Sequence, residues 1–283
     1  MLQSVLFLAL VASSALAGPL SFAERQEKVD FGYEGNSGPN LWPGDCQLTG
    51  AGQSPINIRE GSADAQTLPL PADLVAQPGS KLSNTGHSLD IAFDPAAPKA
   101  SFVPAGQTEP FEVQGVHFHS PSEHRVNGKY FDAEMHIVAK SPAGTISVLG
   151  VFFEISENPQ PNALLSALTA KVALSSPPSF SSGLPLNGAP ATVDVDFDSI
   201  VQGTNLLTGF HSYTGSLTTP PCTTGVLWNV MDTPIPMSVA EALAIRNEIG
   251  FSARFTQVAR DQEPVFSPPN EGLYVFNPLK EVV

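Results

Sequence analysis

Apolar and polar residues alternate with a period of two along much of the chain, which is the pattern of half-buried β-strands. Runs of this kind, ended by Gly, Pro, Asn or Asp, predict strands at residues 87–93, 115–119, 133–139, 146–155 and 225–231. Residues 162–174 and 238–250 have helical spacing instead, and in the second segment Ser238 and Glu241 form a capping box before Gly250 ends the helix. We therefore expect a mainly β (α+β) fold: a single domain built on a large, mostly antiparallel twisted central sheet with a few short peripheral helices.

The N-terminus has the features of a signal peptide. An apolar run at residues 5–12 is followed by Ala15-Leu16-Ala17, and no charged side chain precedes Glu24. We expect residues 1–17 to be the signal peptide, and residues 18–283 to form the single domain of a secreted protein. No later segment reaches about 18 consecutive apolar residues, so no stable membrane anchor is expected.

Composition and cysteine content limit the class of protein, its partners and the state of its cysteines. Acidic residues outnumber basic ones 27 to 13, giving a formal charge of −14, so a nucleic-acid partner is not expected. A content of 42% hydrophobic and 14% charged residues also excludes a disordered chain. The Ser-, Pro- and Gly-rich stretch 175–190 is interpreted as a surface loop. Cys46 and Cys222 are the only cysteines, and secretion favours a disulfide between them over two free thiols.

The histidines carry the strongest chemical signal. In His117-Phe118-His119 the two imidazoles project from one face of a predicted strand, and Phe118 projects from the other. His136 follows on the next predicted strand, where an antiparallel neighbour brings it beside the pair. Three imidazoles on one face suit a tetrahedral Zn²⁺ with one position left open, which is a catalytic arrangement. Glu134 shares the face of His136 and can accept the second N–H of a zinc-bound histidine.

Four blocks of sequence resemble those of the α-class carbonic anhydrases, in the family's order. They are Gln53-Ser54-Pro55-Ile56-Asn57-Ile58, Asn84-Thr85-Gly86-His87-Ser88, the block from His117 to His124 with Glu134-Met135-His136, and Gly215-Ser216-Leu217-Thr218-Thr219-Pro220-Pro221-Cys222. They match the family's N-terminal signature, proton-shuttle segment, zinc-site hairpin and threonine loop. Cys46 and Cys222 fall where secreted members place their disulfide. The chain thus resembles a secreted-type α-carbonic anhydrase, with residues 18–283 as its catalytic domain.

This resemblance implies a zinc lyase that reversibly hydrates CO₂ to bicarbonate and a proton. The Zn²⁺ cofactor would have three ligands: His117, His119 and His136. A zinc-bound hydroxide would attack CO₂. Thr218 would accept the hydroxide's proton in a hydrogen bond and donate its own to Glu123. His87 would carry the product proton toward bulk solvent.

The resemblance also implies a pocket for the small molecules CO₂ and bicarbonate. The residues of this chain at the family's pocket positions, which form an apolar wall and include two threonines, are Val138, Val148, Leu217, Thr218, Thr219, Val226 and Trp228. Tyr33 matches a tyrosine at the polar rim, and sulfonamide-type inhibitors are expected to bind. The family's cis peptide bonds are expected at Ser54-Pro55 and Pro220-Pro221, although cis X-Pro bonds are a small minority.

Two positions depart from the family's pattern. Two residues before His117, the family has a Gln that accepts a hydrogen bond from this histidine; here the residue is Gly115, and Gln114 is out of phase. We expect a water or a backbone carbonyl to orient His117 instead, with lower metal affinity or rate. Near the C-terminus the family's Asn-x-Arg-Pro segment is not clearly present. Residues 254–260 are a candidate replacement, which leaves the partner of His119 open.

Other interpretations of the histidines and two rival functions remain. A single histidine on a strand is more often a hydrogen-bonded core residue than a metal ligand. His124 is interpreted as such a residue, buried behind Glu134, and His211 is interpreted as a surface residue. In a cupin-type metalloenzyme, Glu123 would be a fourth ligand of Fe or Mn, but the Pro-x-Gly turn of cupins is absent. A non-catalytic carbonic-anhydrase-like binding module is the second alternative, although such modules typically lack a zinc histidine.

Overall fold

A computed structural model describes residues 31–48, 52–59, 65–66, 72–172, 191–197, 200 and 209–257. The expected signal peptide and the expected loop at 175–190 lie outside these residues. No helix in the described ranges is both long enough and apolar enough to span a bilayer.

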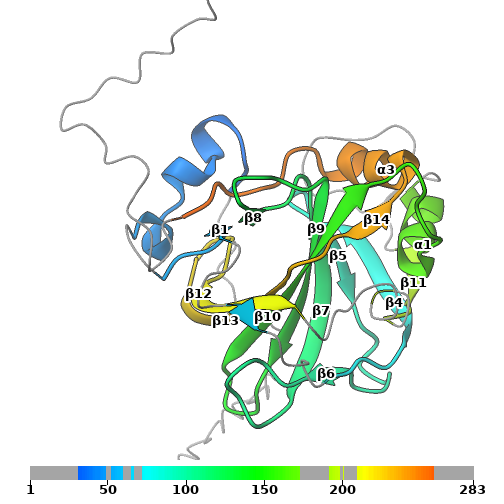
Figure 1. Cartoon of the computed structure of the whole chain (residues 1–283), viewed down its shortest axis with the longest axis horizontal. Coiled ribbons are helices and arrows are strands. Elements are labelled where there is room, and N and C mark those ends of the chain that lie inside the picture. Colours follow the sequence, from blue (N-terminus) through cyan, green and yellow to red (C-terminus); the bar gives the residue numbers. More distant parts are fainter. Residues whose placement is uncertain are drawn as a thin grey trace, which may run out of the picture. The chain divides into compact units, whose positions relative to one another are not determined.

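One twisted sheet of 12 strands dominates the described residues (Figure 1). Nine of its strands follow one another in this order: β11 (Ala191–Val195), β4 (Gln77–Asn84), β5 (Leu89–Ala92), β7 (Phe111–His119), β9 (Ala133–Lys140), β10 (Ile146–Ile155), β13 (Thr224–Met231), β12 (Phe210–Ser216) and β2 (Ala65–Gln66). Three more pair off this path: β14 (Ile235–Met237) with β10, β6 (Ser101–Phe102) with β7, and β3 (Ala72–Asp73) with β6. A separate parallel pair joins β1 (Asn57–Ile58) to β8 (Arg125–Val126).

Pairing within the large sheet is antiparallel except where β10 meets β13 and β14. The predicted fold class is therefore confirmed. All five predicted strands are present, as β5, β7, β9, β10 and β13. The sequence pattern did not predict β4 or β12, because β4 contains Pro78 and Gly79 and β12 is rich in small and polar residues. Both have sheet partners on each side, and this tertiary pairing outweighs their weak local preference.

Both predicted helices are present, as α1 (Ala163–Val172) and α3 (Val239–Ile249), side by side in Figure 1. The capping box of α3 is complete: Ser238 Oγ accepts from the Glu241 N–H at 3.2 Å, and Glu241 Oε2 accepts from the Ser238 N–H at 2.8 Å. Gly250 ends this helix with a φ of 64°, which favours glycine. The described part of the chain before the sheet contains three short 3₁₀ helices: η2 (Gly35–Ser37), η3 (Pro39–Leu41) and η4 (Gly44–Gln47).

A β-bulge in β7 decides which face of the sheet carries the histidines. The buried core residues occupy odd positions before the bulge and even positions after it: Phe111, Val113, Val116 and Phe118. Gln114 is the extra residue, because Val113 and Gly115 pair with consecutive residues of β9. Beyond the bulge, His117 and His119 lie on the face opposite the main core.

The segment before the sheet is held by a disulfide. Cys46 and Cys222 are joined with an S–S distance of 2.08 Å and a Cα–Cα distance of 5.0 Å. Beside it, Trp42 Nε1 donates to the carbonyl oxygens of Gly32 and Ser37. The expected cis peptide bonds at Ser54-Pro55 and Pro220-Pro221 are both present, and a third occurs at Ser120-Pro121.

Candidate metal centre

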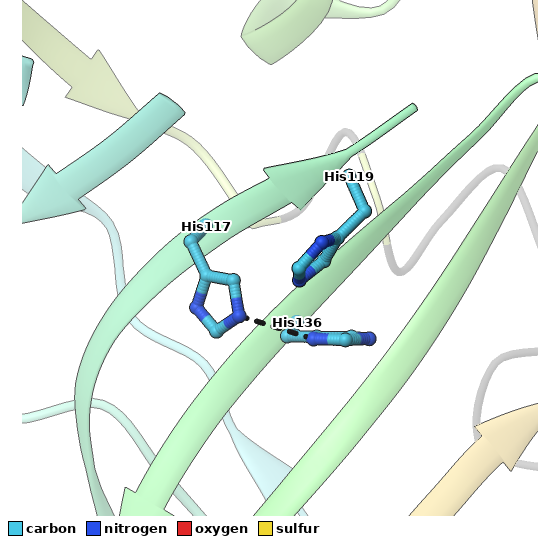
Figure 2. A group of neighbouring side chains, drawn as sticks. All are labelled: His117, His119 and His136. Carbon is cyan, nitrogen blue, oxygen red and sulfur yellow. Dashed lines mark hydrogen bonds between the residues drawn. The ribbon is translucent and has the colours of Figure 1, made fainter. Parts of the chain in front are cut away.

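Three histidine side chains converge above β7 and β9 (Figure 2). His117 and His119 come from β7, and His136 comes from β9 directly opposite His117. The ring centroids are 4.7–5.1 Å apart, and one nitrogen from each ring lies within 4.8 Å of the others. His117 Nε2 and His136 Nδ1 are 3.1 Å apart. The structure therefore brings together the three residues that the sequence singled out.

The chemistry of this donor set fits a metal ion. Burial is the main cause that lowers the pKa of His119 to about 4, that of His117 well below its usual value, and that of His136. The rings are therefore neutral at pH 7, which is the form that binds zinc. His119 Nε2 is also buried without a hydrogen-bond partner among the described residues, a situation that costs about 1–3 kcal/mol. A metal ion held by the three nitrogens would remove this penalty.

Glu134 orients His136 and is itself fully hydrogen-bonded. Its Oε1 accepts from His136 Nε2 at 2.9 Å and from His124 Nδ1 at 2.7 Å. Its Oε2 accepts from the backbone N–H groups of Glu123 and His124, both at 2.8 Å. Burial opposes ionisation, but the interactions with His124 and His136, including their two ring hydrogen bonds, hold the pKa of Glu134 well below its usual value. The carboxylate leaves Nδ1 of His136 as the nitrogen that faces the other rings.

His124 extends this network away from the candidate metal position. It is buried, as expected, and its Nε2 lies 2.6 Å from the Tyr213 hydroxyl, which is 2.8 Å from Ser54 Oγ. Neither Tyr213 nor Ser54 was predicted to take part. Tyr213 lies on β12, a strand that the sequence pattern did not reveal, so no local signal identified it.

A backbone carbonyl orients His119. Its Nδ1 lies 2.6 Å from the carbonyl oxygen of Ser252, which makes this nitrogen the donor and leaves Nε2 for a metal. The partner of His119 therefore lies two residues before the segment 254–260, which was the candidate from the sequence. Arg254 nevertheless contributes, since its N–H donates to Glu123 Oε1 at 2.9 Å and its guanidinium donates to Gln53 Oε1, to the Ser54 carbonyl and to the Cys46 carbonyl.

Glu123 and Thr218 lie beside the histidines and are both buried. Glu123 Oε2 is 3.4 Å from His119 Nε2, but Glu123 is not among the groups within 4.8 Å of all three rings. Burial raises the pKa of Glu123 to about 7, whereas His136, the Thr218 hydroxyl and the Arg254 N–H lower it.

His87, expected as the proton shuttle, and Tyr33, expected at the polar rim, both have rings that lie against Phe31. His87 follows a turn before β5, and its ring stacks on Phe31 with centroids 3.9 Å apart and planes 16° apart. Tyr33 has a buried hydroxyl without a hydrogen-bond partner in the described part of the chain. Burial, and then the charges of Glu123 and Asp90, raise the pKa of Tyr33 well above its usual value.

The expected apolar wall forms one continuous cluster. Its members come from β9, β10, β13 and the loop after β12: Val138, Val148, Leu217, Val226 and Trp228. Val148 pairs with Val138 on one side and with Trp228 on the other, so three of these residues form a row across the sheet. Thr219 is half-buried in the same loop, where its carbonyl oxygen accepts from the Cys222 N–H.

The prediction for His211 was wrong. This residue is buried, with 4% of its surface exposed, and its Nε2 lies 2.9 Å from Asp232 Oδ1. It sits on β12, and the pairing of that strand with β13 and β2 covers it. A strand that the alternation pattern did not reveal therefore explains the burial.

Comparison with known proteins identifies the family. The family model of eukaryotic-type carbonic anhydrases matches residues 37–265. A carbonic anhydrase of Pectobacterium carotovorum is 33% identical over 229 residues, which are 77% of this chain and 83% of that protein. The solved α-carbonic anhydrase of Aspergillus oryzae is 32% identical with a TM-score of 0.69, over 83% of this chain and 95% of that one. That of Thermovibrio ammonificans, in complex with the inhibitor sulfanilamide, is 31% identical with a TM-score of 0.64, over 82% and 96%. The chain therefore belongs to the eukaryotic-type, or α-class, carbonic anhydrase family.

Proposed function

We propose that this protein is a zinc-dependent carbonic anhydrase (carbonate dehydratase) that reversibly hydrates CO₂ to bicarbonate and a proton. The proposal rests on the convergence of His117, His119 and His136, all neutral, and on the buried Nε2 of His119, which has no hydrogen-bond partner among the described residues. When bound, Zn²⁺ supplies Lewis acidity that lowers the pKa of a ligated water to about 7, a value known from carbonic anhydrases themselves. Glu134 and the Ser252 carbonyl hold His136 and His119 in the tautomers that leave a lone pair for the metal.

Thr218 is proposed to orient the attacking oxygen. An ionised Glu123 carboxylate can only accept hydrogen bonds, so the Thr218 hydroxyl donates to it. The Thr218 oxygen is then left to accept a hydrogen bond, which selects an attacking group that carries a proton. The Arg254 N–H fixes the other oxygen of Glu123. A bound cation also favours the ionised carboxylate, against the effect of burial.

The apolar wall is proposed to hold CO₂ beside the metal. CO₂ is linear and uncharged, so it binds against aliphatic side chains without needing hydrogen bonds. Val138 and Leu217 are the half-buried members of the cluster, and the more deeply buried Val148, Val226 and Trp228 support them. Tyr33 is proposed to lie at the polar side, where Glu123 and Asp90 act on it.

Stopped-flow CO₂ hydration by the zinc-loaded protein tests this function. We expect His119→Ala to abolish activity, because it removes a ligand and the Ser252 contact. Thr218→Ala should reduce kcat/KM by about 10²-fold, the usual scale for one positioned hydrogen bond in a reaction, while Thr218→Ser keeps a hydroxyl and should retain most of the rate. Mutants as fast as the wild type would refute the assigned roles.

Metal analysis separates the alternatives. Family membership argues against a cupin, in which iron or manganese would bind with Glu123 as a ligand. A protein that binds one zinc ion but hydrates no CO₂ would instead support the non-catalytic binding module. Inhibition by sulfanilamide, the compound bound to the relative from Thermovibrio ammonificans, is expected if zinc has an open position.

His87 is proposed to transfer the product proton. An unperturbed imidazole has a pKa near neutrality, which suits a group that takes up and releases protons. The ring of His87 stacks on Phe31. His87→Ala should slow turnover, and imidazole buffer should restore part of the rate. A variant whose rate does not respond to buffer would remove His87 from this role.

Secretion is proposed on the N-terminal sequence and the disulfide. A bond between Cys46 and Cys222 is typical of proteins folded in an oxidising compartment. N-terminal sequencing of the mature protein should begin at Gly18. A mature chain that still carries residues 1–17 would contradict the proposal.

A further inference from the structure

Within the described residues, one of the three histidines lacks an orienting partner of the kind that the other two have. His119 is held by the Ser252 carbonyl and His136 by Glu134. For His117, the neighbouring residue on the same face is Gly115, which has no side chain. Gln114 cannot substitute for one, because it is exposed on the bulge and its amide donates to the Glu112 carbonyl. In Figure 2, one ring nitrogen of His117 faces His136 and the other is directed away from both other rings.

Asp90 is placed to fill this role. It pairs directly with His117 across β5 and β7, and His117 pairs in turn with His136 across β7 and β9. Opposite residues of an antiparallel pair project to the same face, with Cβ atoms about 4.5–5.5 Å apart. Asp90 therefore flanks His117 on the side away from His136, whereas its neighbours Leu89 and Ile91 are buried in the main core.

The carboxylate of Asp90 has capacity for another donor. Its Oδ1 accepts from Ser88 Oγ, and this is its only hydrogen bond within the described residues. No direct hydrogen bond joins Asp90 to His117 in the structure, so their interaction requires a side-chain rotation or a bridging water. An ionised carboxylate accepts several hydrogen bonds, so Oδ2 can serve His117 while Oδ1 keeps Ser88.

We propose that Asp90 is a positioning residue for the metal ligand His117, in place of the glutamine found two residues before this histidine elsewhere in the family. The carboxylate accepts Nδ1–H of His117, directly or through one water, and so holds the tautomer that presents Nε2 to the metal. This inference rests on the proposed zinc site. It makes Asp90, His117 and Zn²⁺ a carboxylate–histidine–metal series like that of Glu134 and His136.

Zinc dissociation tests the proposal without reference to activity. Zinc-loaded proteins are mixed with excess dipicolinate, and release is followed with a coloured zinc indicator. Asp90→Ala should release zinc at least about tenfold faster than the wild type, since loss of such a partner usually changes metal affinity 10–100-fold. Asp90→Asn keeps an acceptor oxygen and should show a smaller increase. Glu112→Gln removes an exposed carboxylate from the same strand as His117 and should change nothing.

A second experiment supplies a hydrogen-bond acceptor for His117 from a different position of the chain. Gly115→Gln in the Asp90→Ala background should slow zinc release again. A Cβ at Gly115 would lie 3.1 Å from the Ile91 carbonyl oxygen, so a shift of a few tenths of an ångström is needed. Rescue of this kind would not follow if Asp90 only stabilised the fold.

Imidazole NMR of the zinc-loaded protein gives an independent readout. The Nδ1–H proton of His117 should resonate far downfield in the wild type and move upfield in Asp90→Asn, which serves as the test should Asp90→Ala not fold. Wild-type zinc release in Asp90→Ala, an equal effect of Glu112→Gln, or an unchanged proton resonance would each overturn the inference. A wild type that binds zinc but hydrates no CO₂ would overturn the proposed function alone.

Discussion

Replacing Glu134 with Gln is the sharpest test of how the site is held, because the change keeps the shape and alters only the hydrogen bonds. The carboxylate accepts four: two from the rings of His124 and His136, and two from the backbone N–H groups of Glu123 and His124. An amide can accept on one side only. Its NH₂ group must therefore face two N–H groups or two ring nitrogens.

Each orientation has a measurable consequence. With NH₂ toward the backbone, two bonds to a charged acceptor are lost at about 1.5–3 kcal/mol each, so the free energy of unfolding falls by about 3–6 kcal/mol. With NH₂ toward the rings, His136 must accept at Nε2 and carry its proton on Nδ1, the nitrogen that faces His117. Zinc then loses a ligand lone pair, and its affinity falls at least 10–100-fold.

Urea unfolding of the metal-free protein and zinc release into a chelator measure the two outcomes. Glu154→Gln is the matched control, since it removes a surface carboxylate of β10 that pairs with Lys129. We expect the control to match the wild type in both assays. Glu134→Gln should show a lower free energy of unfolding, faster zinc release, or both. A Glu134→Gln protein with wild-type stability and wild-type zinc release would refute the tautomer argument.

Three further predictions follow from the same geometry. Gly150→Ala should speed zinc release, because the new Cβ would lie 3.1 Å from Glu134 Oε1; release at the wild-type rate would show that the carboxylate adapts. Replacing Cys46 and Cys222 with Ser should lower the free energy of unfolding by at most about 5 kcal/mol, the chain-entropy value for their separation of 176 residues, and an unchanged urea midpoint would contradict this. Burial raises the pKa of Asp90 from 3.8 to about 6, so the group's contribution to stability is present below pH 3.8 and lost as pH rises through 6. Asp90→Asn should therefore flatten the decline in metal-free stability between these pH values, and a curve parallel to that of the wild type would count against the burial argument.

Much of the fold was predictable because its signals are local. Alternating and apolar residues ended by turn residues identified β9, β10 and β13, although the structure buries both faces of these strands over much of their length. The capping box identified the start of α3 from residues three apart. The missed strands β4 and β12 depend on partners far away in sequence. Burial of His211 was missed for the same reason, since the strands that cover it are not evident near it.

The sequence by itself determined which residues do the chemistry. His117 and His119 stand two apart, so they share a face of any strand that contains them, and Glu134 shares a face with His136 for the same reason. The tertiary structure decided which face that is and what holds each ring. The bulge at Gln114 turns the pair away from the core, Ser252 reaches His119 through a carbonyl that every residue type possesses, and Asp90 meets His117 only through strand pairing. The sequence specifies the chemistry of each side chain. Which backbone carbonyl accepts a hydrogen bond from which ring, and which residues lie opposite each other in the sheet, is set only when distant strands pair.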